Sequence, residues 1–440
     1  MTTQPAAAHY LDHIRERQVR AEAALTTEGF ETLVLDAGSP FTHFADDQDA
    51  PFRTNPQFAS WVPLEGPHHK LVIRAGHRPR LVVVRPDDYW YEPIELGSPY
   101  WLEPFEVQVV PDAERAWAAA HGHGRTAYVG DAPAQAKAHG LHDDGLNPQR
   151  LAARLDWDRS YKTAYEVACL EEATRVSARA HHEAKRAFLE GASELEIHHV
   201  YLKAAGCVEH ALPYESIIAL DEKGAFLHYV NKRTKRGGRV LLIDVGAKHA
   251  GYGCDITRTW TAPACDTLFR DLVQAMDRIQ LDLCNAVKPG VPYLQLHLDA
   301  HRRIGSLLHS AGVLDCGGDE ALALGLTRPF FPHGLGHFLG IQVHDVAGRQ
   351  ATPSGGTAPP PTDHPYLRTT RTIEERMLFT IEPGLYFIDM LLKPMRSSPL
   401  ARHVRWDLVD RLMPCGGIRI EDNLLVTAHG HRNLTRPHLP

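Results

Sequence analysis

Residues 239–260, RVLLIDVGAKHAGYGCDITRTW, constrain the fold more than any other stretch of the chain. An apolar run over 240–245 and a second run over 256–260, rich in β-branched and aromatic residues, predict two strands joined by a glycine-containing turn. Each strand carries a carboxylate at a position expected to be buried: Asp244 in the first, and Asp255 just before the second. A buried carboxylate is costly unless it is paired or neutralised, so this pair needs a partner.

The partner of this aspartate pair can be structural or functional. In the structural interpretation the two residues are turn or edge aspartates that form ion pairs with Arg258 or Lys248. In the functional interpretation they belong to a site completed by other parts of the chain. The pair by itself does not separate the two interpretations, and both stay open at this point.

Three later stretches also place charged or polar side chains within apolar sequence. Taken alone, a histidine in a glycine-rich loop or a glutamate before proline is more often structural than functional. The stretches are FFPHGLGHFLGIQVHD (330–345) with His333, His337 and His344, MLFTIEPGLYF (377–387) with Glu382, and GGIRIEDNLLV (416–426) with Arg419 and Glu421.

Taken together, these stretches favour a metal site. Four carboxylates (Asp244, Asp255, Glu382 and Glu421) and one histidine would converge on an apolar core. Two divalent cations would supply the positive charge that such a cluster needs, and oxygen ligands with one imidazole suit Mn, Co or Zn better than Cu. Two-metal sites of this kind hold a bridging hydroxide and clamp a reacting carbonyl or phosphoryl group.

Composition narrows the class of protein. The chain has 440 residues, of which 43% are hydrophobic and 23% charged, as in ordinary globular proteins. Its net charge of −7 argues against nucleic acid or an anionic membrane surface as a partner. We expect no membrane span, and no secretory signal in the first 18 residues. The seven scattered cysteines form neither a disulfide framework nor a thiolate zinc site, which predicts a reduced, cytoplasmic location.

The chain is predicted to form two domains of an α+β protein. In residues 1–158, strand-like runs alternate with helical stretches, which indicates an α/β domain. Residues 159–440 are expected to combine long helices with a largely antiparallel sheet. The predicted strands of the first domain are 32–37, 70–75, 80–85 and 126–131, and the predicted helices of the second are 161–190, 193–205, 266–286 and 294–312, with a capping box formed by Ser193 and Glu196. The segment 346–375 is expected to be an extended surface insertion, mobile in part, and the tail after His431 to be loose.

The order of these motifs resembles the metal-dependent "pita-bread" peptidases, the family of prolidase, aminopeptidase P and methionine aminopeptidase. The carriers are two aspartates separated by ten residues, then HGLGHFLGIQVHD, TIEPG and GIRIED, which together span the second domain. The first-domain segment DDQDAPFRTNPQFASWVPLEG resembles bacterial prolidases, including those with organophosphorus acid anhydrolase activity. One departure is Cys254, where relatives often carry serine. The resemblance implies a pita-bread catalytic domain after the α/β domain.

The resemblance also implies roles for individual residues. The metal ligands would be Asp244, Asp255, His337, Glu382 and Glu421, holding two ions, most simply Mn²⁺, with Co or Zn as alternatives. It leaves open how the ligands divide between the ions. Glu382 would be the general base and His344 would stabilise the oxyanion. Arg419 and His333 would bind the substrate carboxylate, and His228 would be a further pocket histidine.

The implied activity is cleavage of Xaa-Pro dipeptides, with slow hydrolysis of organophosphate triesters as a side activity. Aminopeptidase P, which cuts before proline in longer peptides, shares nearly every motif and is the main alternative. A creatinase-like enzyme without metal and a non-catalytic binding protein are disfavoured, because each of the five ligand positions is occupied by a suitable residue. Relatives of this kind are usually dimers, so a homodimer is expected.

Overall fold

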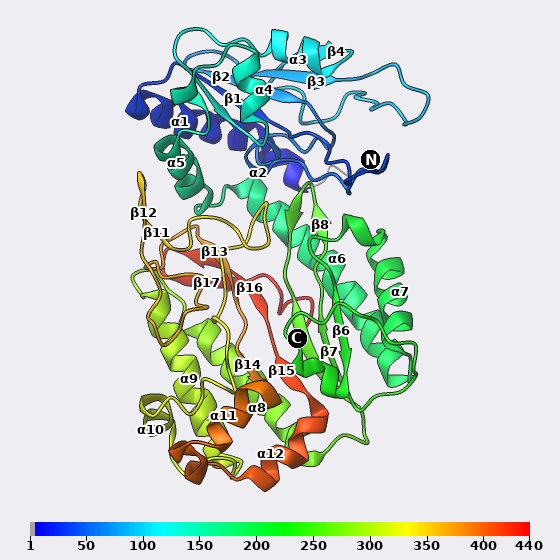
Figure 1. Cartoon of the computed structure of the whole chain (residues 1–440), viewed down its shortest axis with the longest axis vertical. Coiled ribbons are helices and arrows are strands. Elements are labelled where there is room, and N and C mark those ends of the chain that lie inside the picture. Colours follow the sequence, from blue (N-terminus) through cyan, green and yellow to red (C-terminus); the bar gives the residue numbers. More distant parts are fainter. Residues whose placement is uncertain (1–4) are drawn as a thin grey trace. The chain divides into compact units, whose positions relative to one another are not determined.

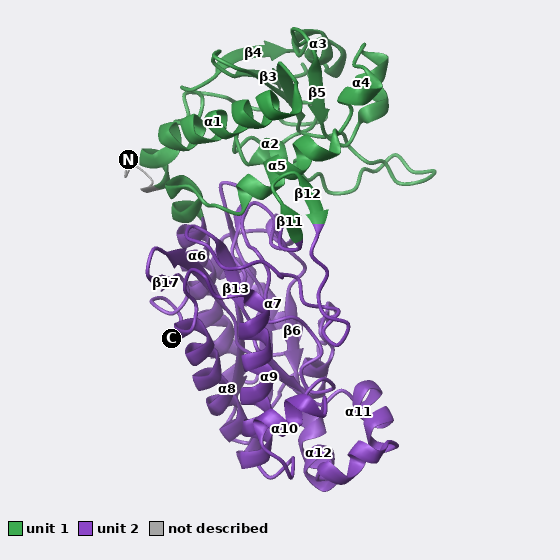
Figure 2. Cartoon of the chain, turned by 90° about the vertical axis from the view of Figure 1, so that its left-hand side faces the viewer, with its two compact units in different colours: residues 1–169, 350–356 green, residues 170–349, 357–440 purple. Residues whose placement is uncertain are grey.

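The computed structural model describes residues 5–440, which form two compact units (Figure 2). The first contains the described residues up to Cys169 together with Gln350–Gly356, and the second contains Leu170–Arg349 and Thr357–Pro440. The expectation about a secretory signal rests in part on residues 1–4, which lie outside the described residues. Within residues 5–440, no helix combines the length and apolar character needed to cross a bilayer.

Helices and strands occur throughout both units. The helices are α1 (Tyr10–Glu28), α2 (Pro56–Ala59), α3 (Ala113–Ala119), α4 (Pro133–Ala138), α5 (Gln149–Arg159), α6 (Ala164–Leu189), α7 (Glu194–Ala205), α8 (Thr267–Asn285), α9 (Tyr293–Ser310), α10 (Gly318–Ala323), α11 (Asp389–Arg396) and α12 (Trp406–Leu412). The strands are β1 (Thr32–Asp36), β2 (Lys70–Arg74), β3 (Arg80–Val84), β4 (Glu106–Val110), β5 (Thr126–Val129), β6 (Ile217–Leu220), β7 (Val240–Asp244), β8 (Lys248–His249), β9 (Tyr252–Gly253), β10 (Thr257–Thr261), β11 (Gln350–Thr352), β12 (Gly355–Thr357), β13 (Leu378–Ile381), β14 (Gly384–Tyr386), β15 (Gly417–Arg419), β16 (Asp422–Thr427) and β17 (Gly430–Asn433).

The first unit is built on a five-stranded mixed sheet in the order β4-β3-β2-β1-β5. Strand β1 runs antiparallel to β2 and parallel to β5, and β3 runs parallel to β4. Trp117 of α3 and Ala136 of α4 pack with Val34, Val72 and Tyr128 of the sheet. The predicted strands are therefore confirmed, as is the mixture of helix and sheet.

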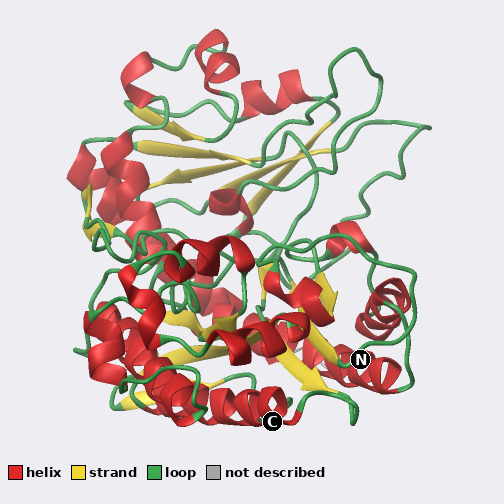
Figure 3. Cartoon of the chain, turned by 60° about the horizontal axis from the view of Figure 1, so that its bottom comes forward, coloured by secondary structure: helices red, strands yellow, loops and turns green. Residues whose placement is uncertain are grey.

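The second unit places helices outside two small sheets (Figures 1 and 3). One sheet has the order β10-β7-β6 and the other β13-β16-β17, while β14 and β15 form a separate pair. Helices α6 and α7 cover the first sheet, where Phe188 and Tyr201 join a cluster with Ile218, Leu241 and Ile243. Helix α8 contacts β13 and β17 of the other sheet and packs against α9. These strand pairs are antiparallel, as predicted.

The long helices of the second unit agree with the predicted ranges. Their starts and ends lie within three residues of the expected ones, because apolar periodicity and caps mark both ends. The capping box before α7 is present: the side chain of Ser193 accepts a hydrogen bond from the backbone N–H of Glu196, and the Glu196 carboxylate accepts one from the N–H of Ser193.

Two expectations about irregular segments are wrong. Residues 346–375 are not simply extended, because β11 and β12 pair as a two-stranded sheet and Leu367, Thr369 and Ile373 are buried. The tail after His431 is packed and not loose. Its Leu439 is buried, and the carbonyl of Leu439 accepts a hydrogen bond from the buried guanidinium of Arg258 at 2.7 Å. A buried arginine needs acceptors for its N–H groups, and the tail provides one.

Candidate metal centre

Two antiparallel strands bring the first pair of carboxylates together. Asp244 is the last residue of β7, and it lies opposite Thr257, the first residue of β10. Asp255 precedes β10 by two residues, and the β8–β9 hairpin between the strands turns at Ala250 and Gly251, both with positive φ. The prediction of two strands joined by a glycine-containing turn is confirmed. Both aspartates are buried.

The histidine-containing loop runs along β13 and is held there by backbone hydrogen bonds. The N–H of Thr380 donates to the carbonyl of His337 at 3.0 Å, and the N–H of Glu382 donates to the carbonyl of Leu335 at 2.8 Å. Gly336 permits this approach, since a Cβ atom at that position would lie 2.1 Å from the Thr380 carbonyl oxygen. The loop therefore requires glycine at 336, and it places His337 beside Glu382.

Glu421 reaches the same place from the link between β15 and β16. Its backbone N–H donates to the carbonyl of Thr257 at 3.0 Å, and its carboxylate accepts a hydrogen bond from the Thr257 hydroxyl at 2.7 Å. The adjacent Asp422 forms ion pairs with Arg258 at 2.8 Å and Arg436 at 2.6 Å. Of the two neighbouring acids, Asp422 is neutralised by two arginines, whereas Glu421 bonds to Thr257, two residues from Asp255.

The structural interpretation of the aspartate pair gave Arg258 or Lys248 as its partner. Arg258 does not have that role, because it pairs with Asp422. Asp244 does pair with an arginine, but this is Arg419, at 2.7 Å. An ion pair with one arginine leaves the remaining carboxylates of the cluster without equal positive charge.

The structure gathers all five predicted ligand residues. Asp255, His337 and Glu421 each offer one ligand atom, and the three atoms lie within 4.8 Å of one another. The Nε2 atom of His337 lies 3.4 Å from Asp255 and 3.6 Å from Glu382. The Nδ1 atom of His337 lies 3.0 Å from the carbonyl oxygen of Phe338, so Nδ1–H donates there and Nε2 is the nitrogen that faces the carboxylates. Asp244 is linked to Asp255 through the hydroxyl group of Tyr214.

Tyr214 connects the two aspartates, and it was not among the predicted site residues. Its hydroxyl oxygen lies 2.8 Å from Asp244 and 2.5 Å from Asp255. A hydroxyl group has a single proton and can donate to only one of the two carboxylates. The other close oxygen–oxygen contact requires a further proton or a cation nearby.

The electrostatics of the cluster also call for positive charge. Burial raises the pKa of Asp244 and Glu421, and it raises the pKa of Glu382 to about 7. Burial acts on Asp255 in the same direction, but the hydrogen bond and charge of His337 outweigh it and lower the pKa of Asp255. Burial opposes the charged form of His337, yet Asp255 and Glu382 raise its pKa. Three of the four carboxyl groups therefore resist ionisation unless cations are present.

A separate observation also indicates that these residues are suited to bind a pair of divalent cations. The Oε1 atom of Glu421 is buried and has no hydrogen-bond partner within the described residues. A buried carboxylate oxygen without a partner is rare and costly, whereas it is the normal state of an oxygen placed to bind a metal ion.

Comparison with known protein families shows the family to which the chain belongs. The model described as Metallopeptidase family M24 matches residues 168–428, the region that carries the whole cluster. This chain is a member of metallopeptidase family M24. A second model, described as the N-terminal domain of Xaa-Pro dipeptidase, matches residues 8–157. The predicted enzyme class, a hydrolytic metallopeptidase, is confirmed.

Relatives of this M24 peptidase match over nearly the whole chain. An Xaa-Pro dipeptidase of Pseudoalteromonas atlantica is 40% identical over 97% of both chains. An Xaa-Pro dipeptidase of Xanthomonas campestris is 43% identical over 99% of both chains. Among solved structures, aminopeptidase P of Escherichia coli, as its His350Ala variant, aligns with a TM-score of 0.74 and 24% identity over 96% of this chain and 95% of that one. This likeness confirms the predicted pita-bread fold.

Arg419 of this M24 peptidase lies at the wall of the cluster and is buried. Its guanidinium donates to Asp244 and to the hydroxyl of Tyr386, each at 2.7 Å, and to Thr257 at 3.3 Å. The Tyr386 hydroxyl lies 2.9 Å from Nε2 of His333, whose Nδ1 lies 2.8 Å from the carbonyl oxygen of Gly334. Burial lowers the pKa of His333 to about 3, so this ring is neutral, with Tyr386 donating to Nε2 and Nδ1–H donating to Gly334.

The two remaining predicted histidines lie on the exposed side of the site. The ring of His344 stands 4.2 Å from that of His337, and desolvation together with His337 and Arg368 lowers the pKa of His344. His228 is exposed and follows the short helical turn at Asp221–Ala225. It is near enough to lower the pKa of both His333 and His344 through its charge. The structure thus brings every predicted substrate residue to the same region.

Tyr214, Thr257 and Tyr386 contact predicted site residues but were not predicted themselves. Tyr386 lies within the stretch 377–387, and Thr257 follows Asp255 by two residues in the first stretch. The period of two along a strand could have placed Thr257 on the side of Asp255. For Tyr214, which precedes the apolar strand β6, the sequence contains no comparable signal.

Proposed function

We propose that this chain is an Xaa-Pro dipeptidase that works with two divalent metal ions. The observation that carries the proposal is the cluster of His337 with Asp255, Glu382 and Glu421, to which Tyr214 joins Asp244, with Glu421 Oε1 left without a partner among the described residues. The relatives named Xaa-Pro dipeptidase, 40–43% identical over nearly the whole chain, support the choice of substrate.

Asp244, Asp255, His337, Glu382 and Glu421 would hold the ions, and we propose Mn²⁺ as the native metal because oxygen ligands dominate the set. When bound, the ions would lower the pKa of a water molecule and polarise the scissile carbonyl group. The compact group of Asp255, His337 and Glu421 is the proposed core of one of the two positions.

Glu382 is the proposed general base. Its carboxylate lies 3.6 Å from His337 and 3.8 Å from His333, and its side chain is 16% exposed, so it can reach an incoming water. It would take a proton from the attacking water and deliver it to the proline nitrogen as the peptide bond breaks. In the metal-free chain burial raises the pKa of Glu382 to about 7, and bound cations would lower it and keep the carboxylate ready to accept a proton.

His344 is the proposed donor to the oxyanion. As a neutral imidazole beside His337 it can donate one N–H to the oxygen that becomes negative when the carbonyl is attacked. His228, on the same exposed side, would line the pocket that receives the substrate.

Arg419 and His333 are the proposed ligands of the substrate carboxylate. In the substrate-free chain the Tyr386 hydroxyl oxygen lies between them, 2.7 Å from Arg419 and 2.9 Å from His333. A carboxylate oxygen that displaced this hydroxyl would accept a hydrogen bond from Arg419, and it would accept one from Nε2 of His333 once that ring takes up a proton, because a neutral ring that donates from Nδ1 offers only a lone pair at Nε2. The hydrogen bonds to Asp244, Tyr386 and Thr257 use three of the five N–H donors of Arg419, and a planar carboxylate suits the others.

The choice of dipeptides is tested by comparing Leu-Pro with Leu-Pro-Gly in the manganese-loaded enzyme. We expect kcat/KM for Leu-Pro to exceed that for Leu-Pro-Gly by at least about 100-fold, because only the dipeptide places a carboxylate on the proline residue. A preference for Leu-Pro-Gly would instead support aminopeptidase P, the second candidate, whose fold this chain shares. Leu-Ala serves as the control for the need for proline.

We further propose slow hydrolysis of organophosphate triesters at the same site. A site that stabilises a tetrahedral, negatively charged carbonyl adduct is also complementary to a pentavalent phosphoryl adduct. The expected result is measurable release of p-nitrophenolate from diethyl p-nitrophenyl phosphate that requires Mn²⁺ and is lost in Asp255→Asn. Triester hydrolysis that survives this substitution while peptide cleavage is lost would show that the two reactions use different sites.

Three further features belong to the proposal. A cytoplasmic location is supported by the seven cysteines, all of them unpaired. A homodimer is supported by exposed aromatic side chains of the first unit, among them Phe44, Tyr89 and Trp90. We retain the domain boundary between residues 158 and 159, at the end of α5.

A further inference from the structure

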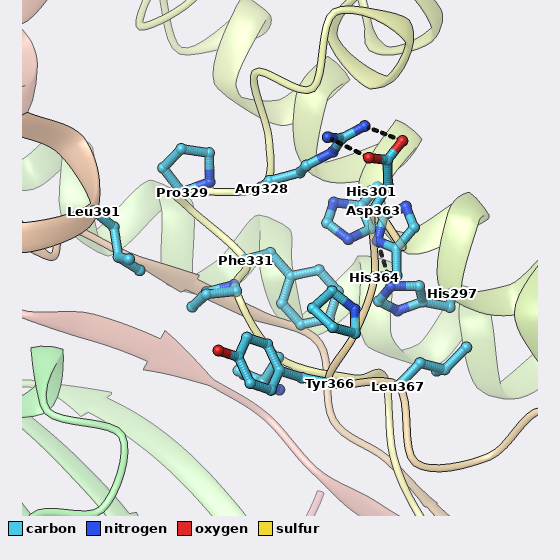
Figure 4. A pocket seen from close by; sticks show the side chains of 13 residues that line it. His297, His301, Arg328, Pro329, Phe331, Asp363, His364, Tyr366, Leu367 and Leu391 are labelled. Atoms are coloured by element: carbon cyan, nitrogen blue, oxygen red, sulfur yellow. Dashed lines mark hydrogen bonds and ion pairs between the residues drawn. The ribbon is translucent and has the colours of Figure 1, made fainter. Parts of the chain in front are cut away.

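A second cluster of histidines lies in the catalytic unit, and the proposed function does not use it. His297 and His301 are four residues apart on α9, so they project from the same face of the helix. His364 comes from the segment that follows β12. The three line a cavity of about 250 Å³, and Figure 4 shows their rings gathered on one side of it.

The three imidazole rings are arranged like the ligands of a single metal ion. Their centroids are 4.7 Å apart for His297 and His301, 4.6 Å for His297 and His364, and 4.8 Å for His301 and His364. One nitrogen of each ring lies within 4.8 Å of the other two. The Nε2 atom of His297 is 3.0 Å from Nδ1 of His364. In a tetrahedral site with Zn–N bonds of 2.0–2.1 Å, neighbouring nitrogens are about 3.3 Å apart, so this pair already has nearly the required spacing.

Two nitrogens of the cluster are buried without partners within the described residues. His301 uses Nδ1 to contact the Thr327 hydroxyl at 2.9 Å, which leaves its buried Nε2 without a hydrogen bond. The buried Nδ1 of His297 also has none, but Nε2 is the nitrogen of His297 that faces His364, so Nε2 of His301 is the unpartnered nitrogen that supports the site. A buried nitrogen without a partner is costly, and an imidazole whose other nitrogen is held by a hydroxyl is the usual arrangement of a metal-binding histidine.

The charge state of the cluster suits a cation. Burial lowers the pKa of all three histidines, to about 3 for His301, so the rings are neutral and keep a lone pair for a metal. Arg328 also lines the cavity, but it is paired with Asp363 at 2.7 Å, as the dashed lines in Figure 4 show. This ion pair limits the repulsion that an entering cation would meet.

We propose that His297, His301 and His364 bind a third metal ion, Zn²⁺, which ties the segment 363–367 to α9. Three neutral imidazoles are a common zinc ligand set, and the cavity leaves the fourth position open for water or a small anion.

A zinc ion at this position would also affect the catalytic site, through the segment 363–367 that carries His364. The carbonyl oxygen of Tyr366 lies so close to Gly334 that a Cβ there would be 2.9 Å away, and Gly334 is the neighbour of His333. His333 itself lines the same cavity. Fixing residues 363–367 would therefore hold one wall of the proposed carboxylate pocket in place.

The proposal is tested by measuring the zinc content of the protein in moles per mole of chain. Wild type, His301→Ala and His364→Ala would be equilibrated with Zn²⁺ alone, dialysed, and measured by inductively coupled plasma mass spectrometry. We expect each variant to contain one zinc ion fewer per chain than wild type. His429→Ala, which removes an exposed histidine of the same unit, is the matched control and should keep the wild-type content.

This difference does not depend on the proposed catalytic metals, because a failure of that proposal would change the wild-type total but not the loss of one ion. His364 is only partly buried, so His364→Ala should fold, as circular dichroism would establish, even if His301→Ala does not. Zinc content equal to wild type in folded His364→Ala would overturn the proposal.

Discussion

Chelation of the purified protein is expected to abolish Xaa-Pro cleavage, and added Mn²⁺ is expected to restore it. The cluster of Asp244, Asp255, Glu382 and Glu421 cannot ionise fully without cations, since burial raises the pKa of three of the four. Loss of the ions would remove the activation of water and the polarisation of the carbonyl that we propose for them, so activity should fall by at least about 1,000-fold. The measurement is the rate of Leu-Pro hydrolysis together with the metal content.

Asp255→Asn should mimic chelation without removing metal from solution. Asp407→Asn changes an exposed aspartate of the same unit and serves as the control, with activity close to wild type. Full activity of a chelated sample that contains no detectable metal would contradict the two-metal proposal.

Metal removal should also lower the melting temperature, by an amount that grows as pH rises. A carboxyl group whose pKa is raised in the folded chain stabilises it below the unfolded pKa of about 4, and this contribution is lost as pH rises through the folded pKa. For Glu382 the folded pKa is about 7, and Asp244 and Glu421 shift in the same direction. The lowered pKa of Asp255 acts only at more acidic pH. Calorimetry at pH 5.5 and 8 should therefore show a wider gap between metal-loaded and metal-free protein at pH 8.

Arg419→Ala is expected to raise KM for Leu-Pro strongly while leaving the metal content intact. Loss of a charge-assisted contact to the substrate carboxylate should cost about 2–4 kcal/mol, or roughly 30- to 1,000-fold. The ion pair of Arg419 with Asp244 does not oppose this expectation, because removing the guanidinium leaves Asp244 more negative and a better ligand for a cation. The measurement is KM and kcat for Leu-Pro with metal analysis of each preparation.

The amidated dipeptide Leu-Pro-NH₂ separates the two roles considered for Arg419. It lacks the carboxylate, so it should be a poor substrate for the wild type and little changed by the substitution. Arg411→Ala, at an exposed arginine paired with Asp266, is the control. Equal damage to both substrates, or loss of metal from the variant, would mean that Arg419 balances the ligand carboxylates and does not bind substrate.

Much of the fold could be predicted from local sequence. The apolar runs on either side of the first turn predicted β7 and β10, and apolar periodicity with the Ser193 capping box predicted α6 and α7. Such patterns succeed because burial of one face and satisfaction of helix ends are local requirements. The tail after His431 was missed, since its order depends on Arg258, far away in the chain.

The candidate site, like the fold, could be predicted only in part from the sequence. The residue types of the cluster, four carboxylates and a histidine within apolar sequence, were enough to predict a metal site, because charge in a core demands compensation wherever the chain folds. Which acid faces the cluster depended on tertiary structure: Arg258 and Arg436 hold Asp422, while Thr257 contacts Glu421.

The sequence by itself therefore determined that charge must be neutralised inside this domain and which strands carry it. Tertiary structure alone decided the partners: Tyr214 between the two aspartates, Arg419 on Asp244, and His364 beside α9. The physical reason is that burial and helix or strand period are properties of neighbours in the chain. A hydrogen bond between residues far apart in the chain depends on a backbone approach of a few ångströms, such as the one that Gly336 permits, and only the packed fold fixes that distance.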